Sequence, residues 1–248
     1  MKFLKSYFNR KFFKQKAPQA FEKTYKSIQS SKTYLKYCQS IHGISIKMLN
    51  TLSPIQLNSL NDIVKKSQAK KVLDLGSGNG ELLVHICNEN SIKGIGIDFS
   101  YLPPSNKFCS FIKSDHEDFN LNDKFDLILS IDSSYMIGDF KRYLKNIIDH
   151  LHPNASALFF MTFTDTSLES SPFIKACKKL KINPEIIDFT NNDYEFWQNS
   201  KKELDALNQE FVDEEHFNLW NIKYKEVLKN LELHQENRTK RYQILIRK

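Results

Sequence analysis

Long apolar runs are missing from this sequence: no stretch approaches the roughly 20 residues that a membrane-spanning helix needs. Its first 16 residues, MKFLKSYFNRKFFKQK, have neither an uninterrupted apolar core nor a small-residue cleavage site, so they do not form a secretory signal. Cysteine is also scarce, and the four cysteines are far apart without a C-x-x-C pair. Neither a disulfide framework nor a metal site is expected, and reduced thiols favour a cytoplasmic protein.

Acidic residues are nearly absent from one end of the chain. Residues 1–36 contain ten Lys or Arg and a single acid, Glu22. That segment carries a charge of +9. The whole chain has a net charge of +7, so residues 37–248 together carry −2. Because nucleic-acid enzymes more often spread basic residues over their catalytic face, a nucleic-acid partner is not favoured.

The first 16 residues carry six positive charges, no acid, and aromatic residues three or four positions apart. This pattern is typical of an amphipathic helix. Two alternatives stay open for residues 1–16: a helix that binds an anionic membrane surface, or an arm that packs on the protein as part of a lid. The nearly neutral remainder of the chain has no second basic patch, which favours the lid.

Beyond this arm, short apolar segments alternate with helical ones, and no repeat or low-complexity linker separates them. Phe21 and Tyr25 are predicted anchors of an early helix, and Ser53 with Pro54 marks the start of another. Strands are predicted at residues 70–76, 93–99, 107–115, 124–132, 157–163 and 240–248, and helices at 80–90, 139–152 and 191–231. Such alternation indicates an α/β fold, a doubly wound and mostly parallel sheet covered on both faces. We expect a helical N-terminal segment over residues 1–52 and a main domain over 53–248, with a helical insert at about 191–232.

The stretch VLDLGSGNGE, residues 72–81, combines a predicted strand with a glycine-rich turn. It lacks the G-x-x-x-x-G-K-[ST] of a phosphate-binding loop, and its glycines are one residue short of the dinucleotide pattern G-x-G-x-x-G. Asp74 decides between the ligand classes, because a carboxylate at the strand end repels pyrophosphate and attracts an ammonium group. The glycines let the backbone approach that ligand closely.

Two further strand ends extend the prediction. Asp98 can accept hydrogen bonds from both hydroxyls of a ribose, and Ser114, Asp115 and His116 are placed to flank an adenine ring. An ammonium group, a ribose and an adenine in that order describe S-adenosylmethionine. The alternatives are that the glycines only pack a helix on a strand, that Asp98 caps a helix, and that residues 114–116 form a solvated loop.

The elements VLDLGSGNGE, GIGIDFS, FIKSDHEDF and FDLILSID resemble class I S-adenosylmethionine-dependent methyltransferases, across roughly residues 55–165. The resemblance implies a seven-stranded sheet in the order 3-2-1-4-5-7-6 with strand 7 antiparallel, and a helical lid formed by the N-terminal and β6–β7 additions. It implies cofactor binding by Asp74, Gly76, Ser77, Gly78, Asn79, Asp98, Phe99, Asp115, His116 and Ser130. One departure is Pro153-Asn154-Ala155 in place of the usual P-G-G turn, where Asn tolerates a positive φ.

The methyl acceptor is expected beyond the fourth strand, where Asp132-Ser133-Ser134-Tyr135 stands. The absence of [DN]-P-P-[YF] disfavours methylation of amide or adenine nitrogen, and no cysteine is placed for attack on a pyrimidine carbon. Asp132 and Tyr135 are the catalytic candidates, since a carboxylate can orient or deprotonate an amine or hydroxyl. Their alternative roles are a helix cap and a core aromatic.

Four residues outside the core fold are predicted to shape the acceptor pocket or its lid: Tyr37, His42, Met48 and Trp197. Around them, residues 37–57, 188–197 and 241–248 look like bacterial small-molecule methyltransferases. The predicted function is therefore methyl transfer to nitrogen or oxygen of a small molecule. The alternatives are an RNA or protein acceptor, and an adaptor that keeps the fold without catalysis. Neither the acceptor nor the oligomeric state follows from the sequence.

Overall fold

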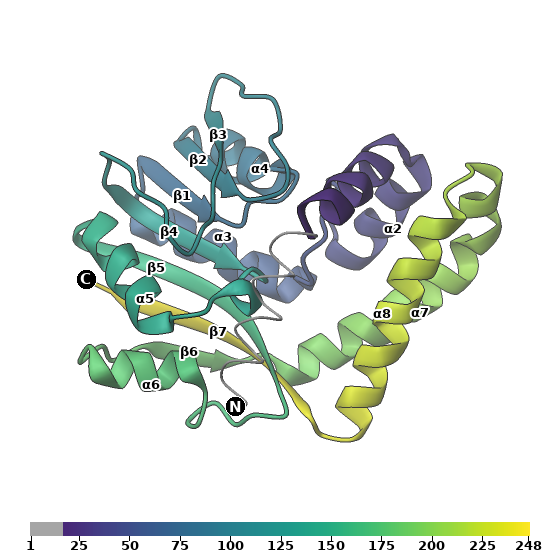
Figure 1. The fold of residues 1–248 in the computed structure, drawn as a ribbon. Coiled ribbons are helices and arrows are strands. Elements are labelled where there is room, and N and C mark those ends of the chain that lie inside the picture. Colours follow the sequence, from purple (N-terminus) through teal and green to yellow (C-terminus); the bar gives the residue numbers. More distant parts are fainter. Residues whose placement is uncertain (1–16) are drawn as a thin grey trace.

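A seven-stranded sheet lies at the centre of the structure, a computed structural model that describes residues 17–248 (Figure 1). The strands are β1 (Lys71–Leu75), β2 (Lys93–Asp98), β3 (Cys109–Lys113), β4 (Phe125–Ile131), β5 (Leu151–Thr164), β6 (Glu185–Asp188) and β7 (Thr239–Arg247). They lie in the order β3-β2-β1-β4-β5-β7-β6. The first five pair in parallel, whereas β7 is antiparallel to β5 and β6. The predicted strand order and antiparallel last strand are confirmed.

Helices cover both faces of the sheet, because successive side chains on each strand point to opposite faces. The covering helices are α3 (Pro54–Ser67), α4 (Glu81–Asn90), α5 (Phe140–His150) and α6 (Pro172–Lys179). Val72 and Leu127 pack with α3 and α4 on one face. The next residues along the two strands, Leu73 and Ile128, pack with α5 and α6 on the other. This two-sided burial explains why the strands are apolar throughout.

A second group of helices lies beside the sheet rather than on either face (Figure 1). It consists of the helix over residues 17–30, α2 (Lys32–His42), α7 (Thr190–Asp213) and α8 (Phe217–Gln235). These helices share an apolar cluster that includes Ile28, Tyr34, Phe196 and Leu204. At its edge the Glu214 carboxylate, between α7 and α8, accepts hydrogen bonds from Ser31 Oγ and the Thr33 N–H. The N-terminal segment and the insert therefore form one helical layer, which we call the side layer.

Local sequence signals account for several boundaries. Ser53 caps α3 in a reciprocal capping box with Gln56, and Asn154 has φ +65° in the turn predicted to need a positive value. The insert, predicted as one helical stretch, is two helices. The predicted helix over residues 139–152 ends at His150, because Leu151 already pairs with Phe125 as the start of β5. The helix α6 and the 3₁₀ helix Ser134–Met136 were not predicted.

Residues 1–16, for which the membrane-binding and lid alternatives were considered, lie outside the described residues. None of the helices within residues 17–248 combines the length and apolar character that crossing a bilayer requires.

Candidate active site

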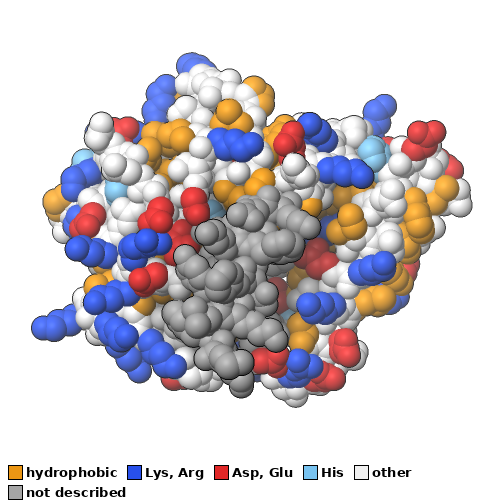
Figure 2. Space-filling view, in the orientation of Figure 1, with side chains coloured by type: hydrophobic (Ala, Val, Ile, Leu, Met, Phe, Trp, Pro, Cys, Tyr) orange, Lys and Arg blue, Asp and Glu red, His pale blue; other side chains and the backbone are white. Residues whose placement is uncertain are grey.

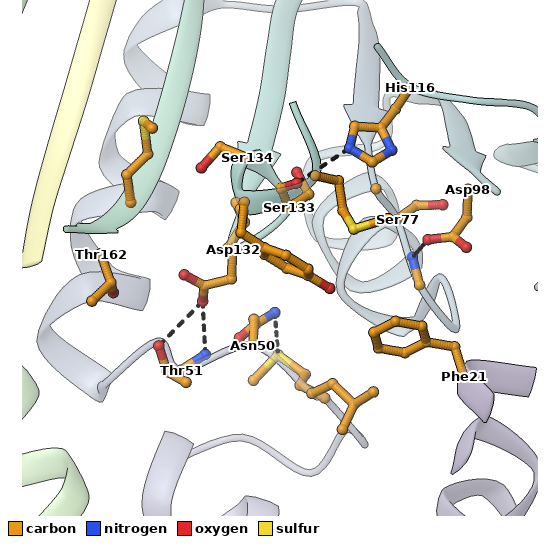
Figure 3. Close-up of a pocket in the computed structure, with 18 of the residues that line it drawn as sticks. Phe21, Asn50, Thr51, Ser77, Asp98, His116, Asp132, Ser133, Ser134 and Thr162 are labelled. Atoms are coloured by element: carbon orange, nitrogen blue, oxygen red, sulfur yellow. Dashed lines mark hydrogen bonds between the residues drawn. The ribbon is translucent and has the colours of Figure 1, made fainter. Parts of the chain in front are cut away.

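A cavity of about 730 Å³ lies where the glycine turn after β1 and the ends of β2 and β4 face the side layer. Figure 3 shows it between the strand ends and Phe21 of the helix over residues 17–30. The loop that contains Asn50 and Thr51 lies along another wall. Among residues 17–248, no group of three His, Cys, Asp or Glu side chains is placed to hold a metal ion. The cavity thus joins segments from both ends of the chain.

The glycine turn is bent so that backbone, rather than side chains, faces the cavity. Gly76, Gly78 and Gly80 have φ values of +84°, +57° and +76°, which residues with a Cβ rarely adopt. The N–H groups of Gly76 and Ser77 both donate to the Ile97 carbonyl, at 2.8 and 3.0 Å, and fix the turn against β2. A Cβ on Gly76 would lie 2.3 Å from the Cβ of Ser133. Glycine is therefore required there by space as well as by conformation.

Asp74 is 4% exposed and lines the cavity behind this turn. Burial raises the pKa of its carboxyl group to about 7, and the nearby charge of Asp98 contributes to the increase. A cationic ligand group would reverse this effect, because it stabilises the ionised carboxylate. The structure thus provides an acid whose charge depends on what lies beside it.

Asp98, at the end of β2, is 5% exposed and lines the same cavity. Its Oδ1 accepts hydrogen bonds from the N–H and hydroxyl of Ser100 and, at 3.2 Å, from the Tyr101 N–H. Its Oδ2 accepts from the Gly78 N–H at 3.0 Å (Figure 3). Oδ1 is thereby occupied by its own loop, so Oδ2 is the atom with room for a ligand hydroxyl.

Of the three residues predicted to bind adenine, two line the cavity and one does not. Phe99 and His116 line the cavity, with ring centroids 6.4 Å apart, and His116 Nε2 lies 3.2 Å from the Ser133 carbonyl oxygen. Asp115 is not among the lining residues, and its Oδ1 accepts from the Glu117 N–H at 3.0 Å. The carboxylate thus stabilises its own loop, and its contact with the cofactor stays a prediction.

Ser130 also lies behind the cavity rather than in its wall. It is fully buried, and its Oγ is 3.0 Å from Ser133 Oγ and accepts from the Tyr143 hydroxyl at 3.1 Å. Ser133 Oγ in turn donates to the Leu75 carbonyl at 2.6 Å. Ser130 thus supports the strand end that carries Ser133, and its direct contact with the cofactor stays a prediction.

Asp132 lines the cavity immediately after β4 with φ +52°, and its carboxylate is fully engaged. Oδ2 accepts from the Thr51 N–H at 2.9 Å and the Thr51 hydroxyl at 3.2 Å (Figure 3). Both terminal nitrogens of Arg241, a fully buried residue of β7, donate to the two carboxylate oxygens. The carboxylate of Asp132 therefore joins the loop at Thr51 to Arg241 of β7 at the cavity wall.

Tyr135 follows in the 3₁₀ helix and also lines the cavity. Its side chain remains 60% exposed, in contrast to the core role considered as an alternative. Of the two residues predicted at the acceptor, Tyr135 is therefore the one with an open surface toward a ligand.

The four predicted pocket or lid residues divide into two pairs. Met48 and Trp197 line the cavity, whereas Tyr37 and His42 do not. The ring of His42 packs on Phe196, its Nδ1 lies 2.6 Å from the Leu52 carbonyl oxygen, and burial lowers its pKa to about 4. Tyr37 is 1% exposed in the core of the side layer. The rings of Tyr37 and His42 thus pack the helices together, and their contact with an acceptor stays a prediction.

Several lining residues were not identified from the sequence. They are Phe21, Thr24 and Tyr25 of the first described helix, and Ile222, Lys223, Glu226 and Asn230 of α8. The spacing of Phe21 and Tyr25 predicts a buried face, and it does not say which surface that face covers. The α8 residues carry no motif, and only the fold brings them to the cavity.

Comparison with protein families gives one match: a model described as a methyltransferase domain matches residues 52–229. Comparison with curated proteins gives no match. The match begins just before the cap of α3 and ends within α8, so it includes strands β1 to β6 and most of the insert but not β7.

Solved structures share the fold at low sequence identity. Phosphoethanolamine N-methyltransferase 2 of Haemonchus contortus, in complex with phosphomonomethylethanolamine and S-adenosylhomocysteine, is 15% identical with a TM-score of 0.66. The match covers 77% of this chain and 52% of that protein, so this chain spans about half its length. The cyclopropane synthase MmaA2 of Mycobacterium tuberculosis is 11% identical, with a TM-score of 0.65 and coverage of 90% and 98%. Mycolic acid cyclopropane synthase CmaA1, complexed with S-adenosylhomocysteine, is 9% identical, with a TM-score of 0.69 and coverage of 92% and 98%.

Proposed function

The chain belongs to the methyltransferase-domain family and is an S-adenosylmethionine-dependent enzyme, and from this premise we propose that it methylates a nitrogen or oxygen atom of a small molecule. The observation that carries the proposal is the wall of the cavity opposite the glycine turn. Trp197, Lys223 and Glu226 of the insert line it together with residues of the N-terminal segment. An acceptor thus enters a space bounded by helices on the side away from the sheet, rather than an open groove.

The residues around the glycine turn fit the cofactor's amino-acid end. Asp74 offers a buried carboxylate for an ammonium group, and the glycines leave room for backbone contact. Ser77 Oγ is buried beside them and has no hydrogen-bond partner among the described residues, which is the condition expected of an atom that a ligand satisfies. Asp98 Oδ2 and the Phe99 ring follow along the cavity for the ribose and the base.

When bound, the cofactor would supply a methyl group whose carbon is activated by the adjacent positively charged sulfur, with S-adenosylhomocysteine as the leaving group. The protein contributes by holding the acceptor close and oriented, and by excluding water. Tyr135 can hydrogen-bond the acceptor through its hydroxyl, or face a cationic nitrogen with its ring. Asp132 contributes by fixing the shape of the acceptor wall through Thr51 and Arg241.

The size and charge of the site favour a small acceptor over a macromolecule. A cavity of about 730 Å³ lies within the range of roughly 300–1,000 Å³ typical of small-molecule sites. Figure 2 shows acidic and basic side chains interspersed over the described part of the visible face, without the basic stripe of a nucleic-acid site. Retention of Asp74, the glycines and Asp98 also argues against an adaptor that has no use for the cofactor.

The test is to incubate the protein with S-adenosylmethionine carrying a labelled methyl group and three separate acceptor pools: a low-molecular-mass metabolite extract, total RNA, and total protein. We expect label in the metabolite pool only. Label confined to RNA or protein would overturn the proposal. Gly76→Val serves as the inactive control, and Gly43→Val is its matched partner: both have a positive φ, but a Cβ at Gly43 lies no closer than 3.7 Å to its neighbours.

The ribose contact predicts a loss of cofactor affinity in Asp98→Asn. Replacing a charged acceptor by a neutral amide removes a charge-assisted hydrogen bond of about 1.5–3 kcal/mol, so the affinity for S-adenosylhomocysteine should fall by about ten- to a hundredfold. Calorimetric titration measures it. Asp126→Asn is the matched control, because Asp126 also accepts two backbone N–H groups, those of Lys70 and Lys71, but lies outside the cavity. Equal affinities in wild type and Asp98→Asn would exclude the ribose assignment.

The acceptor contact predicts a kinetic effect of Tyr135→Phe. Turnover should fall by about tenfold or more, the usual range for a lost orienting hydrogen bond, while the affinity for S-adenosylhomocysteine stays within twofold of wild type. Steady-state kinetics on the acceptor found by the labelling experiment, with calorimetry alongside, measure both. Unchanged kinetics, or a parallel loss of cofactor affinity, would remove Tyr135 from the acceptor site.

A further inference from the structure

Lys223 is a buried lysine that faces the cavity from α8. It is 4% exposed, although lysine is among the residues least often buried without a partner. Its Nζ lies 2.6 Å from Oε2 of Glu226, one turn along the same helix. The side chain of Glu226 is 41% exposed, so the pair joins a solvated carboxylate to a desolvated ammonium group.

The ammonium group has more donors than acceptors around it. A lysine Nζ carries three N–H donors, and within residues 17–248 Glu226 is its one hydrogen-bonded acceptor. Burial opposes the charge, but Glu226 and Tyr37 counteract burial and the pKa of Lys223 is raised overall, so it stays protonated. The hydroxyl of Tyr37 is itself buried without a hydrogen-bond partner in the described part of the chain. The Lys223 ammonium group therefore has donors that no acceptor within residues 17–248 occupies.

The charges around the cavity single out this lysine. Among the described lining residues, the acids are Asp74, Asp98, Asp132 and Glu226, and Lys223 is the one lysine or arginine. The arginine bound to Asp132 lies behind the wall and is occupied by that carboxylate. A negatively charged ligand group therefore meets repulsion elsewhere in the cavity and finds a buried cation with free donors only at Lys223.

We propose that Lys223 binds an anionic group, a carboxylate or phosphate, of a ligand in this cavity; the inference rests on the proposed function for the presence of that ligand. Two sources share this chemistry. One is the carboxylate of the cofactor's amino-acid end, and the other is an acidic group of the acceptor. Lys223 lines the same cavity as Asp74 and the glycine turn, where the amino-acid end of the cofactor is placed, and as Tyr135 on the acceptor side.

The first experiment compares Lys223→Met with wild type by calorimetry, using S-adenosylhomocysteine and 5′-methylthioadenosine, which lacks the amino-acid portion. If the cofactor supplies the anion, the affinity for S-adenosylhomocysteine falls at least about tenfold and that for methylthioadenosine does not change. If the acceptor supplies it, neither affinity changes. Inorganic phosphate or acetate then raises the melting temperature of the wild-type protein saturated with S-adenosylhomocysteine, and fails to do so in the variant. The proposal is overturned if ligand binding and the anion effect are both independent of Lys223.

Two further variants separate binding from a structural ion pair. Glu226→Gln removes the competing carboxylate, so anion-dependent binding should be retained or strengthened, opposite to the effect of Lys223→Met. A purely structural pair would instead lose thermal stability in both variants without a ligand-specific change. Lys201→Met is the matched control: Lys201 pairs with Asp205 at 2.7 Å on the neighbouring helix and lies outside the cavity. If Lys223→Met does not fold, Lys223→Arg and Glu226→Gln carry the test. Failure of wild type to bind S-adenosylhomocysteine would count against the proposed function rather than against Lys223.

Discussion

Arg241→Leu should destabilise the protein strongly, with a loss of about 3–5 kcal/mol in the free energy of unfolding and a fall of about 10 °C or more in melting temperature. Arg241 is fully buried and its guanidinium group holds both carboxylate oxygens of Asp132. Its Nη1 also donates to the Thr162 hydroxyl at 3.1 Å, and its Nε lies 3.9 Å from Asp193. Removing the cation leaves the largely desolvated carboxylate of Asp132 without a counter-charge. Chemical denaturation and thermal scans measure the loss.

Arg238→Leu is the matched control for this prediction. Arg238 lies just before β7 and pairs with Asp165 and Glu236, but its side chain is 48% exposed. Solvent replaces its contacts, so the melting temperature should change little. The double variant Asp132→Leu/Arg241→Leu should recover part of the stability, because it removes both buried charges together. If Arg241→Leu and Arg238→Leu lower the melting temperature equally, the buried ion pair contributes no more to stability than the exposed one.

Cofactor binding should depend steeply on pH, because the pKa of Asp74 is raised to about 7 in the empty cavity. The ligand's ammonium group favours the ionised carboxylate, so binding below pH 7 must also release a proton. The affinity for S-adenosylhomocysteine should therefore fall about tenfold for each pH unit below 7 and level off above pH 8. Calorimetry across pH 5.5–8.5, in buffers of different ionisation enthalpy, measures the affinity and the released proton.

Asp74→Asn tests whether this pH dependence belongs to Asp74. The variant should bind more weakly at pH 8 and show a nearly flat dependence. In the ligand-free protein the raised pKa acts on stability in the opposite direction: the folded state holds the proton more tightly than the unfolded chain, whose carboxyl has a pKa near 3.8. The contribution of Asp74 to unfolding free energy therefore decreases as pH rises from about 4 through 7, by up to about 4 kcal/mol. If the affinity of Asp74→Asn for S-adenosylhomocysteine still depends steeply on pH, a group other than Asp74 causes that dependence.

The sheet and the glycine turn could be predicted because their signals are local. The apolar run before Asp74 is buried on both faces, and positive φ at Gly76 and Gly78 leaves glycine little alternative. Asn154 adopts the positive φ for which glycine is the usual residue in this turn. Each of these follows from backbone sterics and periodicity within a few residues, without knowledge of the tertiary structure.

The surroundings of the predicted site residues could not be read from the sequence where they depend on which partner a side chain finds in the folded protein. The sequence around Asp132 suggests a free acid, but its partner Arg241 is 109 positions away, and no pattern connects them. Tyr37 and His42 lie in a segment that does reach the cavity, yet their own rings turn into the helical core. Lys223 resembles any exposed helical lysine until packing against α2 and α7 buries it. Tertiary contacts decide these cases, and helix periodicity alone cannot.

The side layer has a consequence for the segment that matches the family, residues 52–229, if it is produced as a separate fragment. Helix α2 contributes Tyr34, Cys38 and Ile41 to the same apolar cluster as Phe211 of α7, and Glu214 ties α7–α8 to the start of α2. A fragment limited to residues 52–229 would leave half of that cluster without its cover, and would be prone to self-association through it. Because the N-terminal segment and the insert share this cluster, the two are expected to unfold as one cooperative unit.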